Sequence, residues 1–195
     1  MENQQAELPL FPLDTVLYPG GWLPLRIFEP RYLEMIRDCA RSGSGFGIVC
    51  RLTDEAGEPG VHAGIGTEAV IGDFYTTDDG LLGITALGRR RFRVEAETRR
   101  PGGLIVGTVE WLTEPESRPV PPQFGALSGL LNELVRRVGK DYPVEADPDN
   151  AVTLAWRLAE LLPFDADVRQ LLLETHDPLA RLEHLLSMME SDEED

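Results

Sequence analysis

The chain has 195 residues, of which 42% are hydrophobic, and this composition is typical of a folded globular protein. The length gives room for one substantial core, or for a barrel-like unit with a smaller helical unit, and it excludes a series of enzyme domains. The formal net charge of −16 at pH 7 disfavours nucleic-acid phosphates and anionic membranes as partners, because like charges repel.

The amino-terminal residues 1–7 are polar and have neither the basic region nor the apolar region of a secretory signal. Apolar windows further along, such as 151–163, contain charged residues and are too short to cross a bilayer. The two cysteines, Cys39 and Cys50, lie in apolar contexts that indicate a reducing compartment. We therefore expect a cytoplasmic protein without a membrane segment.

The first half of the chain is predicted to be mostly β, because short runs of β-branched and aromatic residues alternate with glycines. One helix interrupts these runs: Pro30 suits its first position, and apolar residues recur at helical spacing until Gly43. Asp79-Gly80 predicts a tight turn between two strands. The expected strands cover residues 8–13, 22–28, 46–52, 64–75, 81–88, 91–97 and 105–112.

The second half is predicted to be helical. Apolar residues recur at helical spacing in four stretches, with Asp149 or Asn150 expected to cap the second helix and Asp165 the third, while Asp177-Pro178 starts the fourth. We expect an α+β fold in which a small β-barrel with one inserted helix precedes a helical bundle. The predicted segments are the barrel 7–114, a proline-rich connector 115–122, a helical subdomain 123–190 and an acidic tail 191–195.

The residues contain no recognisable catalytic or metal-binding motif. The only lysine, Lys140, lacks the upstream glycine of a phosphate loop, and no serine stands in a nucleophile motif. Cys39 and Cys50 are too far apart in sequence for a zinc-ligand pair, and the three histidines share no ligand spacing with them. We therefore expect a protein that is not an enzyme and that holds no metal or cofactor.

Six arginines within twelve positions form a local exception to the acidic composition. Arg89, Arg90, Arg99 and Arg100 are candidates for a patch that binds an anionic partner, because guanidinium groups pair with phosphates and carboxylates. Cross-strand ion pairs with neighbouring glutamates are the favoured alternative for this segment.

Several motifs follow one another in a distinctive order along the chain. They are Leu8-Pro9-Leu10-Phe11-Pro12-Leu13, Phe28-Glu29-Pro30-Arg31-Tyr32, Gly64-Ile65-Gly66-Thr67-Glu68-Ala69, Gly88-Arg89-Arg90-Arg91-Phe92-Arg93-Val94 and Leu158-Ala159-Glu160-Leu161-Leu162-Pro163. This order resembles the amino-terminal, substrate-binding domain of Lon proteases, from about residue 7 to residue 189. The resemblance implies a PUA-like β-barrel followed by a helical bundle, and a role in recognising protein substrates. The ATPase and Ser–Lys peptidase of full-length Lon have no counterpart in these residues.

The leading hypothesis is a stand-alone, non-catalytic module that binds unfolded or specific protein clients, with a separate protease or chaperone as a further partner. Its expected binding surface consists of Tyr18, Trp22, Arg26, Phe28 and Tyr32, because aromatic residues and arginine beside a turn can anchor an extended apolar peptide. Packing in the core is the competing role for each of them. The other hypotheses are a PUA-like protein that binds RNA or a nucleotide, an enzyme with a pocket between barrel and helices, and a scaffold without a binding role.

Overall fold

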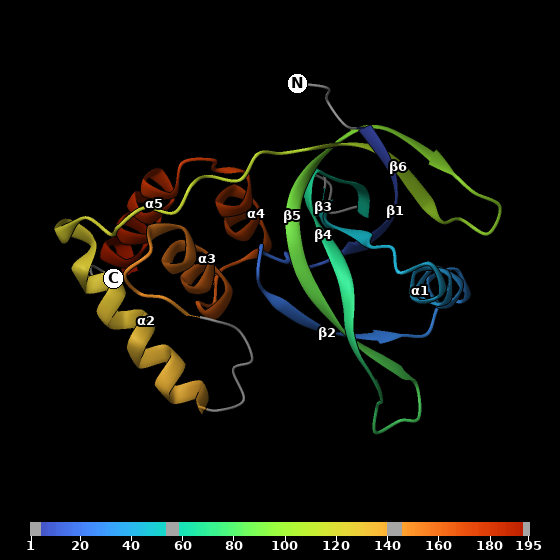
Figure 1. Ribbon diagram of the computed structural model, residues 1–195, viewed down its shortest axis with the longest axis horizontal. Helices are drawn as coiled ribbons and strands as arrows, with labels where there is room; N and C mark the ends of the chain where they lie inside the picture. The colour runs from blue at the N-terminus through green and yellow to red at the C-terminus, as the bar shows by residue number, and fades with distance from the viewer. Residues whose placement is uncertain (1–4, 54–58, 140–145, 193–195) are drawn as a thin grey trace. The chain divides into compact units, whose positions relative to one another are not determined.

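The computed structural model describes residues 5–53, 59–139 and 146–192. The chain divides into two compact units, Met1–Thr113 and Glu114–Asp195 (Figure 1). The elements of the first unit are β1 (Gln5–Leu13), β2 (Trp22–Ile27), α1 (Pro30–Ser42), β3 (Phe46–Thr53), β4 (Pro59–Thr76), β5 (Leu82–Arg99) and β6 (Ile105–Trp111).

The six strands form one mixed sheet in the order β2-β5-β4-β3-β1-β6. Strands β1 and β3 pair in parallel, and the other neighbours pair antiparallel. Strand β6 pairs with β5 as well as with β1, so the hydrogen-bonded pairs run in a closed circuit through β5, β4, β3, β1 and β6. Strand β2 lies outside this circuit and, among the described strands, pairs only with β5.

Strand β5 corrects the strand prediction for residues 81–97. Two separate strands were expected, 81–88 and 91–97, with a break at Arg89-Arg90, but the structure has one continuous strand, Leu82–Arg99. The chain stays extended at Gly88 because its N–H donates to Gly21 at 2.9 Å and its carbonyl accepts from Gly20 at 3.0 Å. Glycine at this position therefore reflects a close backbone approach within a strand rather than the end of a strand.

Helix α1 packs one apolar face against the sheet. Its buried residues Tyr32, Met35, Ile36 and Cys39 lie three or four positions apart and form a core cluster with side chains of β2, β3 and β5. The helix begins at Pro30, as predicted, and ends before Gly43, whose φ of 68° is the left-handed conformation that favours glycine at a helix end. The inserted helix expected from the sequence is therefore present.

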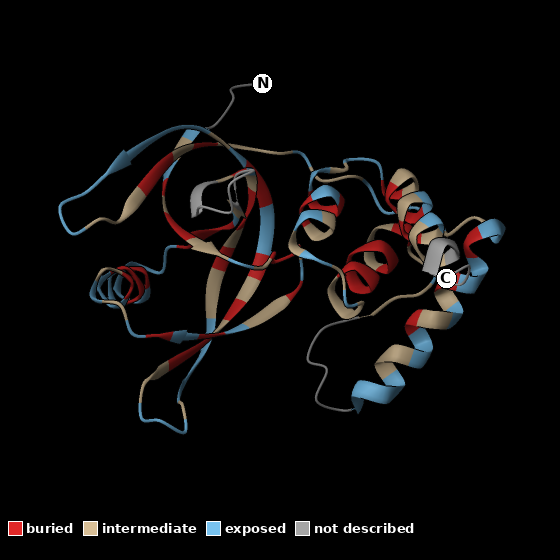
Figure 2. Cartoon of the chain, turned by 180° about the vertical axis from the view of Figure 1, so that it is seen from behind, coloured by how far each residue is buried: buried red, intermediate tan, exposed pale blue. Residues whose placement is uncertain are grey.

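The second unit contains four α-helices among its described residues. Helix α3 contacts each of the other three, and most of its residues are buried (Figure 2). A helix that is apolar around most of its circumference is typical of the interior of a helical unit. The helical elements are η1 (Pro122–Phe124), α2 (Gly125–Val138), α3 (Ala151–Leu161), α4 (Ala166–Glu174) and α5 (Pro178–Asp192).

The start of α3 is tied to the proline-rich segment that precedes the helices. Asn150 Oδ1 accepts from the backbone N–H of Val152 at 3.0 Å, and Asn150 Nδ2 donates to the Ser117 hydroxyl at 2.8 Å. Asp165 occupies the equivalent position before α4, but its side chain makes no capping hydrogen bond. Of the two residues predicted for α3, Asn150 is the cap, whereas the capping bond predicted for Asp165 is absent.

We expect Asn150→Ala to lower the free energy of unfolding by about 1 kcal/mol, because an N-cap side chain satisfies helix N–H groups that have no partner within the helix. Asp165→Ala is the matched control and should cost only a few tenths of a kcal/mol, since no capping bond is lost. Urea unfolding followed by circular dichroism measures both values. Equal losses for the two variants would contradict the role assigned to Asn150.

Candidate functional site

The β4–β5 hairpin carries an aromatic ring on each face near its turn. Tyr75 of β4 and Arg26 of β2 both lie opposite Gly83 of β5, so these three residues share one face of the sheet. A Cβ on Gly83 would lie 2.2 Å from the Tyr75 ring. The glycine therefore allows the ring to lie against the sheet. Phe74 lies opposite Ile84, on the other face, where Ile84 belongs to the core cluster under α1.

Arg26 connects β2 to the hairpin turn. Its guanidinium lies 5.5 Å from the centroid of the Phe28 ring and pairs with the Asp79 carboxylate at 2.9 Å. The Thr77 hydroxyl also donates a hydrogen bond to Asp79, and this bond, with Arg26 adding to it, lowers the pKa of the Asp79 carboxyl. The carboxylate therefore stays ionised, and it keeps Arg26 beside Phe28.

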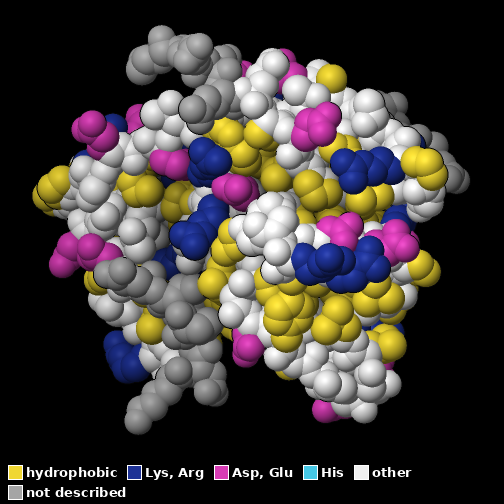
Figure 3. All heavy atoms as spheres, turned by 45° about the vertical axis from the view of Figure 1, so that its right-hand side comes forward, with side chains coloured by type: hydrophobic (Ala, Val, Ile, Leu, Met, Phe, Trp, Pro, Cys, Tyr) yellow, Lys and Arg dark blue, Asp and Glu magenta, His cyan; other side chains and the backbone are white. Residues whose placement is uncertain are grey.

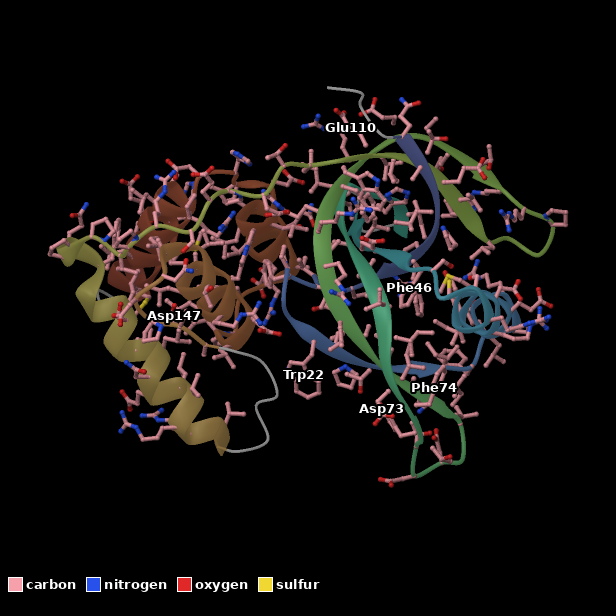
Figure 4. The ribbon with its side chains drawn as sticks, viewed as in Figure 1. Trp22, Phe46, Asp73, Phe74, Glu110 and Asp147 are labelled. Carbon is pink, nitrogen blue, oxygen red and sulfur yellow. The ribbon has the colours of Figure 1, made fainter. Side chains whose placement is uncertain are left out.

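Arg26, Phe28 and Tyr75, together with Phe74 on the opposite face of β4 from Tyr75, are called the hairpin surface below. Phe28 is 58% exposed and Phe74 is 50% exposed, which is unusual for large aromatic side chains. Figure 4 shows Phe74 and Asp73 on opposite sides of β4. Figure 3 brings forward the side of the molecule that lies on the right in Figure 1, and hydrophobic side chains gather there next to charged ones. Exposed apolar side chains with a charged border are typical of a protein-binding surface.

The structure separates the five residues that the sequence analysis grouped as a binding surface. Arg26 and Phe28 are exposed and adjacent, and Trp22 is half-buried. Tyr18 and Tyr32 are buried, and the Tyr32 ring stacks on Phe11 with 4.1 Å between centroids. Burial also raises the pKa of the Tyr32 phenol. Arg26 and Phe28 are therefore exposed, whereas Tyr18 and Tyr32 contribute to packing.

The arginines of β5 do not form one patch. Arg89 and Arg90 lie in the middle of the strand, and Arg99 and Arg100 lie at its end, nine or more residues further along. Arg90 stacks 3.6 Å from the Trp111 ring centroid and pairs with Glu68 of β4 at 3.0 Å, which is the cross-strand ion pairing expected as the alternative. The expected anionic-partner patch is therefore split, and Arg90 is already engaged.

The described residues show no group of three or more His, Cys, Asp or Glu side chains positioned to hold a metal ion. Cys39 and Cys50 are both buried free thiols, and burial raises the pKa of the Cys39 thiol. Across the described helices, none combines the length and the apolarity needed to span a bilayer.

Sequence reasoning missed Phe74 and Tyr75 as site residues, although they precede the correctly predicted turn at Asp79-Gly80. Two consecutive aromatic residues in a strand place one ring on each face. Near the end of this hairpin both rings are exposed, Phe74 at 50% and Tyr75 at 38%. The consecutive aromatic pair Phe74-Tyr75 is visible in the sequence, but its exposure becomes clear only from the pairing of β4 with β5.

Comparison with known proteins identifies the class of protein to which this fold belongs. The chain belongs to the family of the ATP-dependent protease La (LON) substrate-binding domain, whose model matches residues 7–191.

Solved structures of relatives have the same fold. A Lon N-terminal domain protein from Xanthomonas campestris is 41% identical, with a TM-score of 0.79 over 93% of this chain and 98% of that one. The N-terminal domain of Lon protease from the Mycobacterium avium complex is 22% identical, with a TM-score of 0.68 over 93% of this chain, and it supports the fold alone.

Curated relatives are full-length Lon proteases. Those from Erwinia amylovora and Escherichia coli are 26% and 25% identical, and each alignment covers 97% of this chain. The chain spans about a quarter of the length of these relatives, 25% in both cases. The matched family model describes their substrate-binding domain only.

Proposed function

We propose that this protein is a non-catalytic module that binds exposed apolar segments of unfolded or specific protein clients through the hairpin surface. One observation carries the proposal: Phe74 near the β4–β5 turn and Phe28 just after β2, which pairs with β5, are each at least half exposed, in a family defined by substrate binding.

The chemistry of the hairpin surface suits a polypeptide client. Aromatic rings and arginine supply much of the binding energy in protein interfaces, because they bury a large area with few rotatable bonds. Arg26 is already held by Asp79 and Phe28, so less side-chain entropy is lost when a client binds. The net charge of −16 favours clients that are neutral or basic.

The test is the binding of a reduced, carboxymethylated model protein, measured by fluorescence anisotropy with the double variant Phe28→Ala/Phe74→Ala. We expect its affinity to fall at least tenfold, because two truncated aromatic contacts each contribute about 1 kcal/mol or more in such interfaces. Val138→Ala/Leu171→Ala is the matched control, since these side chains are 45% and 44% exposed on other elements. Equal affinity of both double variants for the client would overturn this assignment of the surface.

Finer features of the family resemblance belong to the same proposal. We propose that the six-stranded sheet is a PUA-like barrel and that α2–α5 form a bundle. The closed circuit of strand pairs and the central place of α3 among the helices support these descriptions. We also propose the segment borders 7–114, 115–122, 123–190 and 191–195, a cytoplasmic location, and a separate protease or chaperone that receives the client.

A further inference from the structure

A cavity of about 380 Å³ lies between α1 and the turn that joins β5 to β6. Its floor is apolar, because Met35 and Cys39 belong to the core cluster and Leu104 packs against that cluster. Its walls carry charges of both signs, from Arg31, Glu34 and Asp38 on α1 and from Arg100 on the turn. The cavity is separate from the hairpin surface, with which it shares no residue.

The β5–β6 turn, which contributes Arg100 to the cavity, is held by hydrogen bonds. The β5–β6 turn is closed by hydrogen bonds from Gly103 N–H to Arg100 at 2.9 Å and from Arg100 N–H to Leu104 at 2.8 Å. Arg31 Nη1 donates to the Gly103 carbonyl at 3.4 Å, so this turn lies against the first turn of α1. The α1 helix and the turn lie side by side in Figure 1. The backbone of Arg100 is therefore fixed in a turn that contacts the first turn of α1, and Arg100 lines the cavity from this turn.

Two opposite charges on the cavity wall do not pair with one another. Among the described residues, neither Arg100 nor Glu34 has an ion-pair partner. The other two charged residues of the wall do: Arg31 pairs with Glu29 at 2.6 Å, and Asp38 pairs with Arg37 at 3.1 Å. An occupant with one acidic and one basic side chain would satisfy both charges. An occupant with a single charge would satisfy one and be repelled by the other.

We propose that this cavity binds an extended peptide segment in which an acidic residue and a basic residue are two positions apart. The acidic side chain pairs with Arg100 and the basic side chain lies between Glu34 and Asp38. The spacing follows from geometry. Helix α1 rises about 1.5 Å per residue. About 7.5 Å therefore separates Arg31, which contacts the turn, from the point midway between Glu34 and Asp38. Two residues of extended peptide span about 6.6 Å and place both side chains on one face.

This inference rests on the proposed function, because it assigns a second contact to the same polypeptide client. The probe is a fluorescein-labelled hexapeptide with blocked ends, Ala-Asp-Val-Lys-Leu-Ala, titrated by anisotropy. A peptide of identical composition, Ala-Val-Asp-Lys-Leu-Ala, places the two charges on opposite faces and serves as the sequence control. We expect the first peptide to bind at least fivefold more tightly than the second.

Variants of the full chain locate the binding. Arg100→Gln and Glu34→Gln are each expected to weaken the first peptide up to about fivefold, since each removes one pair between exposed charges, which contributes at most about 1 kcal/mol. Arg41→Gln, which removes an exposed arginine of α1 outside the cavity, is expected to leave binding unchanged. Circular dichroism melts confirm that the variants are folded.

The proposal is overturned if both peptides bind alike, if neither binds at millimolar protein, or if Arg100→Gln and Glu34→Gln bind like Arg41→Gln. Its failure is distinguishable from failure of the proposed function. Loss of the carboxymethylated client in Phe28→Ala/Phe74→Ala, without any peptide binding, would retain the hairpin surface and remove the cavity. Peptide binding that is unaffected by Phe28→Ala/Phe74→Ala and weakened by Arg100→Gln is the expected result.

Discussion

Gly88→Ala is expected to lower the free energy of unfolding by about 3–5 kcal/mol. A Cβ at this position would lie 2.2 Å from the backbone oxygen of Tyr18, and a backbone atom cannot rotate away as a side chain can. The loop that contains Tyr18 must move away from β5, which costs about 1–3 kcal/mol for the overpacking and weakens the two hydrogen bonds that tie Gly88 to Gly20 and Gly21. Urea unfolding followed by far-ultraviolet circular dichroism measures the loss.

Gly64→Ala is the matched control for Gly88→Ala. Gly64 also lies in a long strand, β4, but a Cβ there meets nothing within 4 Å and its φ is not positive. Its replacement should change stability by less than about 0.5 kcal/mol, or stabilise slightly, because alanine restricts the unfolded chain. A loss at Gly88 no larger than at Gly64 would show that the approach of Tyr18 to β5 is not required.

Arg181→Ala is expected to lower the free energy of unfolding by about 3–4 kcal/mol. The Arg181 guanidinium is fully buried and lies 3.3 Å from the centroid of the Trp156 ring. Its Nε donates to the Leu172 carbonyl at 2.9 Å, and its Nη2 donates to the Thr175 carbonyl. These carbonyls lie at the end of α4, where no helical N–H follows, so truncation leaves buried acceptors without donors and removes the contact with the ring.

Arg137→Ala provides the comparison for Arg181→Ala, because Arg137 is exposed on α2 and pairs with Glu133 one turn away. Such pairs contribute about 0.3–0.5 kcal/mol. Arg181→Lys should recover only part of the loss, since one ammonium cannot replace both the planar stacking and the divergent donors of a guanidinium. A loss below about 1 kcal/mol for Arg181→Ala would mean that Leu172 and Thr175 find other donors.

The candidate site was only partly predictable, as its aromatic residues illustrate. Phe28 and Tyr32 stand four residues apart in the same motif, yet Phe28 is exposed and Tyr32 is stacked under α1 on Phe11. Residue type marks both as large and partly apolar, and it does not say which will be covered. Phe74 and Tyr75 became visible as site residues only through the pairing of β4 with β5.

The family, the α+β composition, and the start and end of α1 at Pro30 and Gly43 could all be predicted from the order of the residues. These features depend on local backbone preferences and on the spacing of apolar residues, which are written in neighbouring positions. The long-range contacts of the folded chain were needed to show that β5 continues through Gly88, that β6 pairs with β5, and that Arg100 and Glu34 line one cavity. Each of these depends on contacts between residues far apart in the chain, and local periodicity carries no information about which distant partner a strand or a charge will meet.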